Sequence, residues 1–183
     1  IGAENSFFVN PHGLPDERHH TTARDLALIS AYAMENSTFR NIVSCKYYEA
    51  RGWKNKNKML FGYEGADGVK TGFTVRAGRC LVTSAERNGM RVVCTVLSSP
   101  QMYERTAELL DEAFARYQPV TLCEKGQQFD GMTAAHEFCY PLTETERDFV
   151  RYETVCSDGN GGLLKIYLKN DLLFSQNLYM IER

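Results

Sequence analysis

The sequence has no long apolar run and no excess of charge of one sign. Its uninterrupted apolar stretches are a few residues long, such as Val92–Cys94, whereas a membrane-spanning helix needs about 20 apolar residues. Its 21 basic and 23 acidic residues give a formal net charge of −2, so composition gives no case for nucleic-acid binding. With 43% hydrophobic and 24% charged residues, the composition is that of a folded globular protein.

The six cysteines form no C-x-x-C pair and no zinc-like spacing. Asn88-Gly89 predicts a two-residue hairpin between strands 79–87 and 90–98, in which the numbers of opposite residues sum to 177. This register places Cys80 and Cys94 on opposite faces of the sheet. We therefore expect these two cysteines to be small buried hydrophobes rather than a disulfide, and the other four are left open.

The four histidines give no metal site, and no cofactor is expected. His12, His19 and His20 lie in a loop-like segment, with no carboxylate or cysteine at ligand spacing beside them. His136 and Cys139 would lie on opposite faces of a strand. We therefore expect neither a metal site nor a thiol–imidazole pair there.

Residues 1–20 read as a loop, and a helix follows from about residue 23 to residue 36. Thr22-x-x-Asp25 is a capping box with Asp in place of Glu. Arg24 and Asp25 are expected on a solvated face, where the carboxylate favours the helix dipole. The core face consists of Ala23, Leu26, Ala27, Ser30, Ala33 and Met34. A second short helix is expected over 38–44.

Three strands are predicted over 68–74, 79–87 and 90–98, and short connections make them an antiparallel meander. The last two strands are apolar on both faces in places, which indicates a sheet covered by helices on both sides. Ser99 is expected to cap a helix that has Pro100 in its first turn and ends near Tyr117.

A domain boundary is expected at Pro119, dividing the chain into residues 1–117 and 118–183. After it, the pattern changes to short period-2 runs, which predict a small all-β domain. Ser157–Gly162 is expected to be a turn cluster and Lys169–Asp171 a hairpin turn. The expected strands are Val120–Cys123, Glu137–Tyr140, Phe149–Val155, Leu163–Leu168 and Leu172–Met180.

Lys70-Thr71-Gly72 carries the clearest chemistry in the sequence. It lies on the expected strand 68–74, and Lys-Thr-Gly on a strand is typical of serine acyl-transfer sites that handle peptides ending in a carboxylate. An ammonium supplies positive potential and a hydroxyl hydrogen-bonds a carboxylate. The glycine lets a substrate backbone lie against the strand. An ordinary surface lysine in an ion pair is the alternative for Lys70.

The segment from residue 5 to residue 114 resembles the serine D-alanyl-D-alanine carboxypeptidases, the low-molecular-mass penicillin-binding proteins. Five pieces carry the resemblance in the family's order: Asn5–Leu14, Thr21–Ala27, Asn55–Leu60, Asp67–Thr74 and Ala77–Leu81. The resemblance implies an α+β fold: a partial penicillin-binding or β-lactamase-like domain over 1–117, with an antiparallel sheet and helices. The family's β-rich C-terminal domain corresponds to 118–183.

The sequence departs from the family in lacking a nucleophile. The family places a Ser-x-x-Lys and a Ser-x-Asn motif before Lys-Thr-Gly. Here no Ser is followed three residues later by Lys, and the only Ser-x-Asn is Ser175–Asn177, far downstream. We therefore expect the chain to be the C-terminal portion of such an enzyme and to be inactive by itself.

The resemblance also implies roles for individual residues. Lys70 would raise the positive potential, Thr71 and Gly72 would receive the substrate's terminal carboxylate and backbone, and the backbone N–H of Phe73 would be one of two oxyanion donors. Lys56 belongs to the polar, aromatic and basic stretch 46–58, which is either a solvated loop or a rim that attracts an anionic peptide end. In the family, a basic residue near this position often approaches the carboxylate site.

The implied substrate is a peptidoglycan stem peptide ending in D-Ala-D-Ala, with β-lactam antibiotics as ligands and the bacterial cell envelope, outside the cytoplasm, as the location. Two alternatives remain: a related β-lactamase-like serine hydrolase, and a non-catalytic envelope binding or scaffold protein. The expected sheet would have an exposed edge and a bare apolar face. These would be covered by the missing N-terminal part of the catalytic domain or by another chain.

Overall fold

The computed structural model describes residues 1–156 and 161–180. The chain divides into two compact units, Ile1–Phe114 and Ala115–Arg183, each of which is described by itself. Pro119, the expected boundary, lies inside strand β6 (Gln118–Cys123), where it pairs with Pro141. The expected turn cluster at 157–162 begins in residues outside the described part of the chain, and its last two residues, Gly161 and Gly162, are in a strand.

Helix α1 (Ala23–Met34) begins at the predicted capping box. The Thr22 side chain accepts a hydrogen bond of 3.1 Å from the backbone N–H of Asp25. Ser30 and Met34 are buried as expected, but Ala23 is exposed. The core-facing stripe therefore begins one turn later than the sequence pattern suggests.

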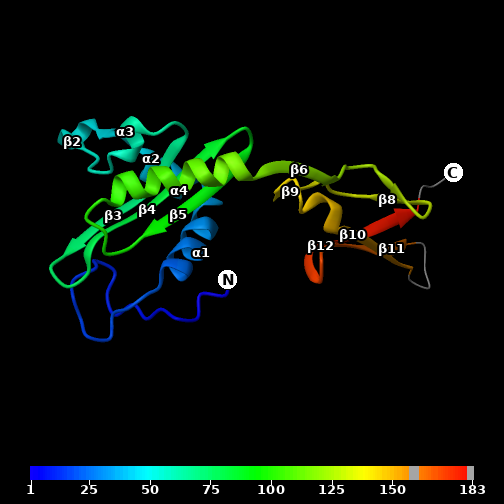
Figure 1. The fold of residues 1–183 in the computed structure, drawn as a ribbon, viewed down its shortest axis with the longest axis horizontal. Coiled ribbons are helices and arrows are strands. Elements are labelled where there is room, and N and C mark those ends of the chain that lie inside the picture. Colours follow the sequence, from blue (N-terminus) through cyan, green and yellow to red (C-terminus); the bar gives the residue numbers. More distant parts are fainter. Residues whose placement is uncertain (157–160, 181–183) are drawn as a thin grey trace. The chain divides into compact units, whose positions relative to one another are not determined.

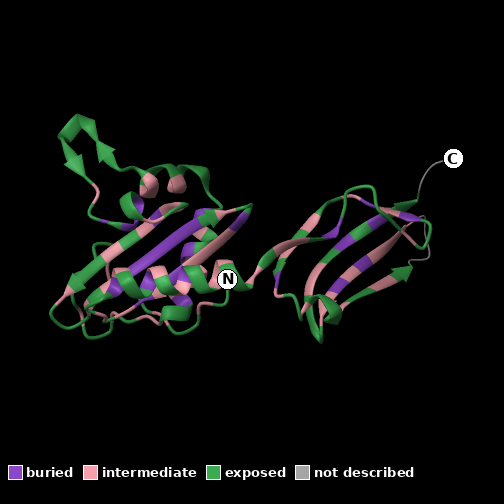
Figure 2. Cartoon of the chain, turned by 45° about the horizontal axis from the view of Figure 1, so that its top comes forward, coloured by how far each residue is buried: buried purple, intermediate pink, exposed green. Residues whose placement is uncertain are grey.

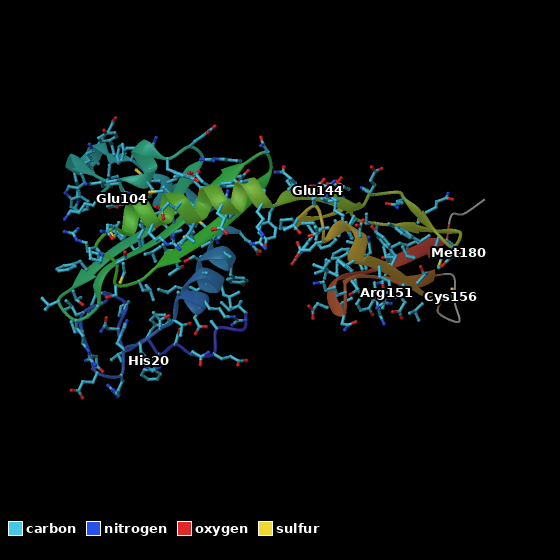
Figure 3. All side chains as sticks on the ribbon, in the orientation of Figure 1. His20, Glu104, Glu144, Arg151, Cys156 and Met180 are labelled. Atoms are coloured by element: carbon cyan, nitrogen blue, oxygen red, sulfur yellow. The ribbon has the colours of Figure 1, made fainter. Side chains whose placement is uncertain are left out.

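Asp25 contradicts the expectation of a solvated face, because it is fully buried. Its Oδ2 accepts hydrogen bonds from the Asn5 backbone N–H at 2.7 Å and from the Ser6 hydroxyl at 2.8 Å. The Ser6 hydroxyl is the main reason that the pKa of Asp25 lies below its usual value. The N-terminal loop thus folds back over the helix start, which local sequence patterns do not reveal. Figure 3 labels His20 in this loop.

Helix α2 (Ser37–Ser44) matches the expected second helix, but the stretch 46–58 is not simply a loop. Strands β1 (Tyr47–Tyr48) and β2 (Trp53–Lys54) form a short antiparallel hairpin around a 3-10 turn, Glu49–Arg51. A single helical turn, α3 (Met59–Gly62), follows the hairpin. Two-residue strands give too short a pattern to be recognised in the sequence.

The three predicted strands form an antiparallel sheet in the order β3-β4-β5. They are β3 (Ala66–Thr74), β4 (Gly78–Arg87) and β5 (Met90–Val96), shown in Figure 1. The predicted register is confirmed, since Thr83 lies opposite Cys94. Both Cys80 and Cys94 are free, although only Cys94 is buried. Burial raises the pKa of the Cys94 thiol.

Helices cover both faces of this sheet, as expected. On one face, Leu81 and Ala85 pack with Met102 and Leu110 of α4 (Met102–Arg116). Figure 1 shows α4 running along the sheet. On the other face lie α1 and α2, which contact strands β3 to β5. The helix α4 begins at Met102, two residues later than a cap at Ser99 would require.

The second unit is all β, with a five-stranded sheet in the order β10-β11-β12-β8-β7 and a two-stranded sheet of β6 and β9. The longer strands correspond to the predicted runs: β9 (Phe138–Leu142), β10 (Val150–Cys156), β11 (Gly161–Leu168) and β12 (Asp171–Met180). The short strands β7 (Gln128–Phe129) and β8 (Met132–Ala134) were not predicted.

The core of the second unit forms between these strands, as the buried positions in Figure 2 show. It comprises Leu122, Cys123, Met132, Ala134, Leu142, Leu164, Ile166 and Leu178. Leu164 and Ile166 are fully buried, as the alternation in β11 predicts. Among the described residues, no helix is both long and apolar enough to cross a membrane.

Candidate active site

The Lys-Thr-Gly motif lies on β3, an outer strand of the three-stranded sheet. Lys70, Thr71 and Gly72 pair on one side with Val82, Leu81 and Cys80 of β4. Lys70 and Gly72 are exposed and Thr71 is half-buried, and the Lys70 ammonium donates a hydrogen bond to the Thr71 carbonyl. Among the described residues no strand pairs with the other side of β3. This strand edge therefore has the geometry to receive an extended peptide.

An ion pair anchors the start of β3 across the sheet. Asp67 binds the guanidinium of Arg91 on β5, and Arg91 also donates a 2.8 Å hydrogen bond to the Ser84 hydroxyl on β4. Glu86 is a second carboxylate partner of Arg91. One arginine thus links all three strands just before the motif through charge-assisted hydrogen bonds.

Asn57 supports the start of β3, a contact that the sequence did not predict. It is buried, and its amide donates a 3.1 Å hydrogen bond to the carbonyl of Gly68, two residues before Lys70. Its Oδ1 accepts from the Met59 backbone N–H at 3.1 Å. The Asn55-x-Asn57 pattern is the available signal in the sequence, in which Lys56 between the two asparagines is the residue predicted to have a role.

Lys56, the proposed carboxylate-rim residue, is exposed. Its backbone carbonyl accepts a 3.1 Å hydrogen bond from the Tyr103 hydroxyl of α4. The backbone of Lys56 is therefore held by α4, and the next residue, Asn57, contacts β3. Its role at the carboxylate site stays a prediction.

Gly72 differs from the neighbouring glycines in what a side chain would meet. A Cβ at Gly65 would lie 2.3 Å from the Glu86 carbonyl oxygen, so packing requires glycine there, and one at Gly68 would make a tight contact of 3.1 Å with the Val43 side chain. Gly78 has φ = +68°, which also favours glycine. A Cβ at Gly72 would meet only Cys80, at an ordinary 3.9 Å. The described fold gives no reason for glycine at position 72, whereas a ligand lying against the strand would.

Phe73 follows the motif, and its side chain is 68% exposed. The Arg79 guanidinium lies 5.9 Å from the centre of its ring. From residue 68 to residue 85 the chain has three basic residues, Lys70, Arg76 and Arg79, and no acidic one. This end of the sheet is therefore suited to an anionic ligand.

The histidines serve local structure in the part of the chain that is described. The Nδ1 atoms of His12 and His19 accept backbone hydrogen bonds from Leu14 and Val9, and the His20 ring stacks with Phe7. No group of three or more His, Cys, Asp or Glu side chains there is arranged to hold a metal ion.

The sequence model of the D-alanyl-D-alanine carboxypeptidases, peptidase S11, matches residues 1–101. The chain belongs to this family. The match covers more than half of the chain and includes β3 with its Lys-Thr-Gly motif. The carboxypeptidase of Streptomyces sp. strain K15 is 38% identical over 120 residues, which are 59% of this chain and 41% of that protein. DacF of Bacillus subtilis is 31% identical over 137 residues, 69% of this chain and 35% of that protein.

Comparison with solved structures shows that the similarity includes the fold. Penicillin-binding protein 5 of Haemophilus influenzae superimposes with a TM-score of 0.73 and 26% identity, over 98% of this chain and 61% of that one. A mutant of the Streptomyces K15 DD-transpeptidase gives 0.57 and 37% identity over 61% of this chain and 48% of that one. The expected α+β, penicillin-binding-protein-like fold is confirmed. The chain spans about two fifths or less of the length of the two curated relatives.

Proposed function

We propose that this chain forms one wall of the active site of a serine D-Ala-D-Ala carboxypeptidase that acts on peptidoglycan stem peptides. In this proposal the strand edge of β3 receives the peptide's carboxylate end. Lys70 supplies positive potential, Thr71 hydrogen-bonds the carboxylate and Gly72 leaves room for the substrate backbone. Lys56 adds a cation at the rim.

The observation that carries the proposal is the open space at Gly72, beside an exposed ammonium on an unpaired strand edge. Packing in the described fold does not require glycine there, and close approach of a ligand supplies a physical reason for it. The cationic surroundings favour an anionic ligand. Family membership supports the same site.

The proposed chemistry is acyl transfer. A serine attacks the carbonyl carbon of the penultimate D-Ala, the terminal D-Ala leaves with a proton on its amine, and water then hydrolyses the ester. The backbone N–H of Phe73 would be one donor to the tetrahedral oxyanion, and such a donor is worth roughly 2.7–4 kcal/mol of barrier. Because this sequence has no Ser-x-x-Lys, the serine must come from residues outside it. By itself the chain is then inactive.

We infer that those residues, or another chain, also cover part of the first unit. The outer edge of β5 has no strand partner among the described residues. Beside it lies a hollow of about 570 Å³. Its apolar lining residues are Ala27, Leu28, Ala31, Met34 and Val93, and its charged ones are Arg24, Glu35, Arg40 and Arg91. Uncovered apolar surface next to a free strand edge favours association. A monomer with no exposed apolar patch in light scattering and dye-binding measurements would contradict this inference.

Fluorescent penicillin tests the function and its alternatives. Stable stoichiometric labelling of the full-length gene product is expected. In cells, we expect the labelled protein in the bacterial cell envelope, outside the cytoplasm. Rapid turnover would instead indicate a β-lactamase-like hydrolase. No labelling would indicate a non-catalytic envelope binding protein, an alternative that the missing Ser-x-x-Lys motif keeps open. Labelling of the 183-residue chain alone would refute the claim that it lacks the nucleophile.

A further inference from the structure

The hairpin of β1 and β2 presents a cluster of exposed aromatic rings. Tyr47, Tyr48 and Trp53 are 57%, 52% and 60% exposed, and Phe61 of α3 beside them is 39% exposed. Figure 2 shows the hairpin as an exposed projection of the first unit. We call these four residues, with Lys46, Arg51 and Lys54, the aromatic hairpin. So much exposed ring surface in one place marks an interaction site.

The rings of the aromatic hairpin pack on one another and not on either hydrophobic core. Tyr48 and Trp53 are cross-strand partners with ring centres 6.1 Å apart. Tyr47 meets Phe61 edge to face at 5.7 Å. These contacts order the side chains before any partner arrives, which lowers the entropy lost on binding.

Cations surround the rings. The Arg51 guanidinium lies 5.2 Å from the centre of the Trp53 ring, and the ammonium groups of Lys54 and Lys46 lie 4.8 and 5.8 Å from that of Phe61. Within the hairpin itself, from residue 46 to residue 54, the chain has three basic residues and one acidic residue, Glu49. The surface therefore combines apolar rings with net positive charge, and an anionic partner complements it.

We propose that the aromatic hairpin binds the surface of an anionic phospholipid bilayer. Trp and Tyr rings are amphipathic and settle at the headgroup level of a bilayer. Lys and Arg stems lie along apolar surface while their charged ends reach the lipid phosphates. A soluble polyanion would use the cations but would leave the exposed rings in water. The bilayer uses both.

The test uses a property of the composition: the chain has one tryptophan, Trp53, so tryptophan fluorescence reports on the aromatic hairpin alone. The full 183-residue chain is mixed with vesicles of phosphatidylglycerol and phosphatidylcholine in equal amounts, and with vesicles of phosphatidylcholine only. We expect a blue shift of Trp53 emission, quenching by brominated lipid, and co-sedimentation with the anionic vesicles only.

Variants distinguish the contribution of charge to vesicle binding from the contribution of ring burial. Each Lys or Arg near an anionic surface contributes about a fivefold increase in binding, so Arg51→Gln/Lys54→Gln should lower the partition coefficient about 25-fold. Tyr48→Ser should weaken both the blue shift and the co-sedimentation. Lys125→Gln/Arg147→Gln removes one Lys and one Arg from the second unit and is the matched control, expected to bind as the unaltered chain does. Circular dichroism confirms that each variant is folded.

Three results would overturn the proposal. The first is an unchanged Trp53 emission with anionic vesicles. The second is an equal loss of binding in the control variant, which would indicate net charge alone. The third is a blue shift of the same size with soluble polyglutamate, which would assign the aromatic hairpin to acidic polymers. Because none of these measurements involves a nucleophile or a penicillin, their failure is distinct from failure of the proposed function.

Discussion

The two units of the chain differ in where they bury polar groups. Six of the seven buried polar or charged residues among those described belong to the first unit, and Gln176 alone belongs to the second. In the first unit, Asn57 is bonded to the start of β3 and Asp25 to the N-terminal loop. In the second, Gln176 bonds the backbone of His136 and the thiol of Cys123 inside an apolar core.

This difference bears on how substitutions should affect each unit. Buried polar groups cost free energy unless they are fully hydrogen-bonded, so an apolar core is the simpler way to stabilise a small unit. The first unit accepts that cost where it positions the Lys-Thr-Gly strand. Among the described residues of the second unit, Gln176 is the one buried polar group. We therefore expect substitutions in the first unit to affect chemistry as well as stability, and substitutions in the second unit to affect stability.

The largest effect is expected from a core substitution in the second unit. Leu164→Ala removes a fully buried side chain and should cost about 2–5 kcal/mol. That is a large fraction of the stability of a unit this small. Hydrogen exchange read by mass spectrometry should show lost protection in β10 to β12. Leu172→Ala, at an exposed position of β12, is the control and should lie within about 0.5 kcal/mol of the unaltered chain.

In the first unit, Lys70→Met should act on chemistry and leave the fold intact. Its side chain is exposed, so thermal unfolding should be unchanged. In the full-length gene product, acylation by fluorescent penicillin should slow by about 10²–10³-fold, since charge that stabilises the transition state is lost. Lys125→Met should acylate normally. Equal acylation rates in the two variants would contradict a role for Lys70 in the reaction.

Asn57→Ala tests whether the buried polar groups position β3. It leaves the Gly68 carbonyl and the Met59 N–H without their side-chain partner, at a cost of about 1–3 kcal/mol. Acylation of the full-length product should slow as well. Asn41→Ala, at an exposed position of α2, should change neither quantity. A stability loss without a kinetic effect would reduce Asn57 to a structural residue.

The lowered pKa of Asp25 predicts that its contacts with the N-terminal loop stabilise the fold less at acid pH. Its pKa in the folded chain is lowered, chiefly by the Ser6 hydroxyl, so the stabilisation is present above the unfolded pKa of about 3.9. It is lost as the pH falls through the lower folded value. Thermal unfolding between pH 5 and pH 2 should show this loss, and Asp25→Asn should lack that part of it. An identical pH dependence in both proteins would contradict the assignment.

Only a small effect on stability is expected at Gly72. A Cβ there makes only an ordinary contact with Cys80, so Gly72→Ala should change the free energy of unfolding by less than about 1 kcal/mol. Gly68→Ala, where Val43 lies at 3.1 Å, is the comparison and should destabilise the first unit more. Gly72→Ala should still weaken penicillin binding. Normal binding by this variant would mean that no ligand backbone passes there.

Much of the fold could be predicted because its signals are local. Asn88-Gly89 fixed the β4–β5 register, and the alternation in β11 identified Leu164 and Ile166 as core residues. The short strands β1, β2, β7 and β8 were missed, because two or three residues carry no usable period. The candidate site was predicted from Lys70–Gly72. The support from Asn57 was not predicted, because a side-chain hydrogen bond between residues 11 apart has no periodic pattern in the sequence.

The sequence by itself determined the family, the antiparallel meander, the position of the Lys-Thr-Gly motif and the lack of a Ser-x-x-Lys motif. Each of these depends on residues that are close together in the sequence. Only the tertiary structure decided that Asp25 is buried and that Arg91 links three strands. It also decided that Gly72 is free of packing constraints while Gly68 is not. These facts depend on residues that are distant in the chain and come together only when the sheet and helices pack.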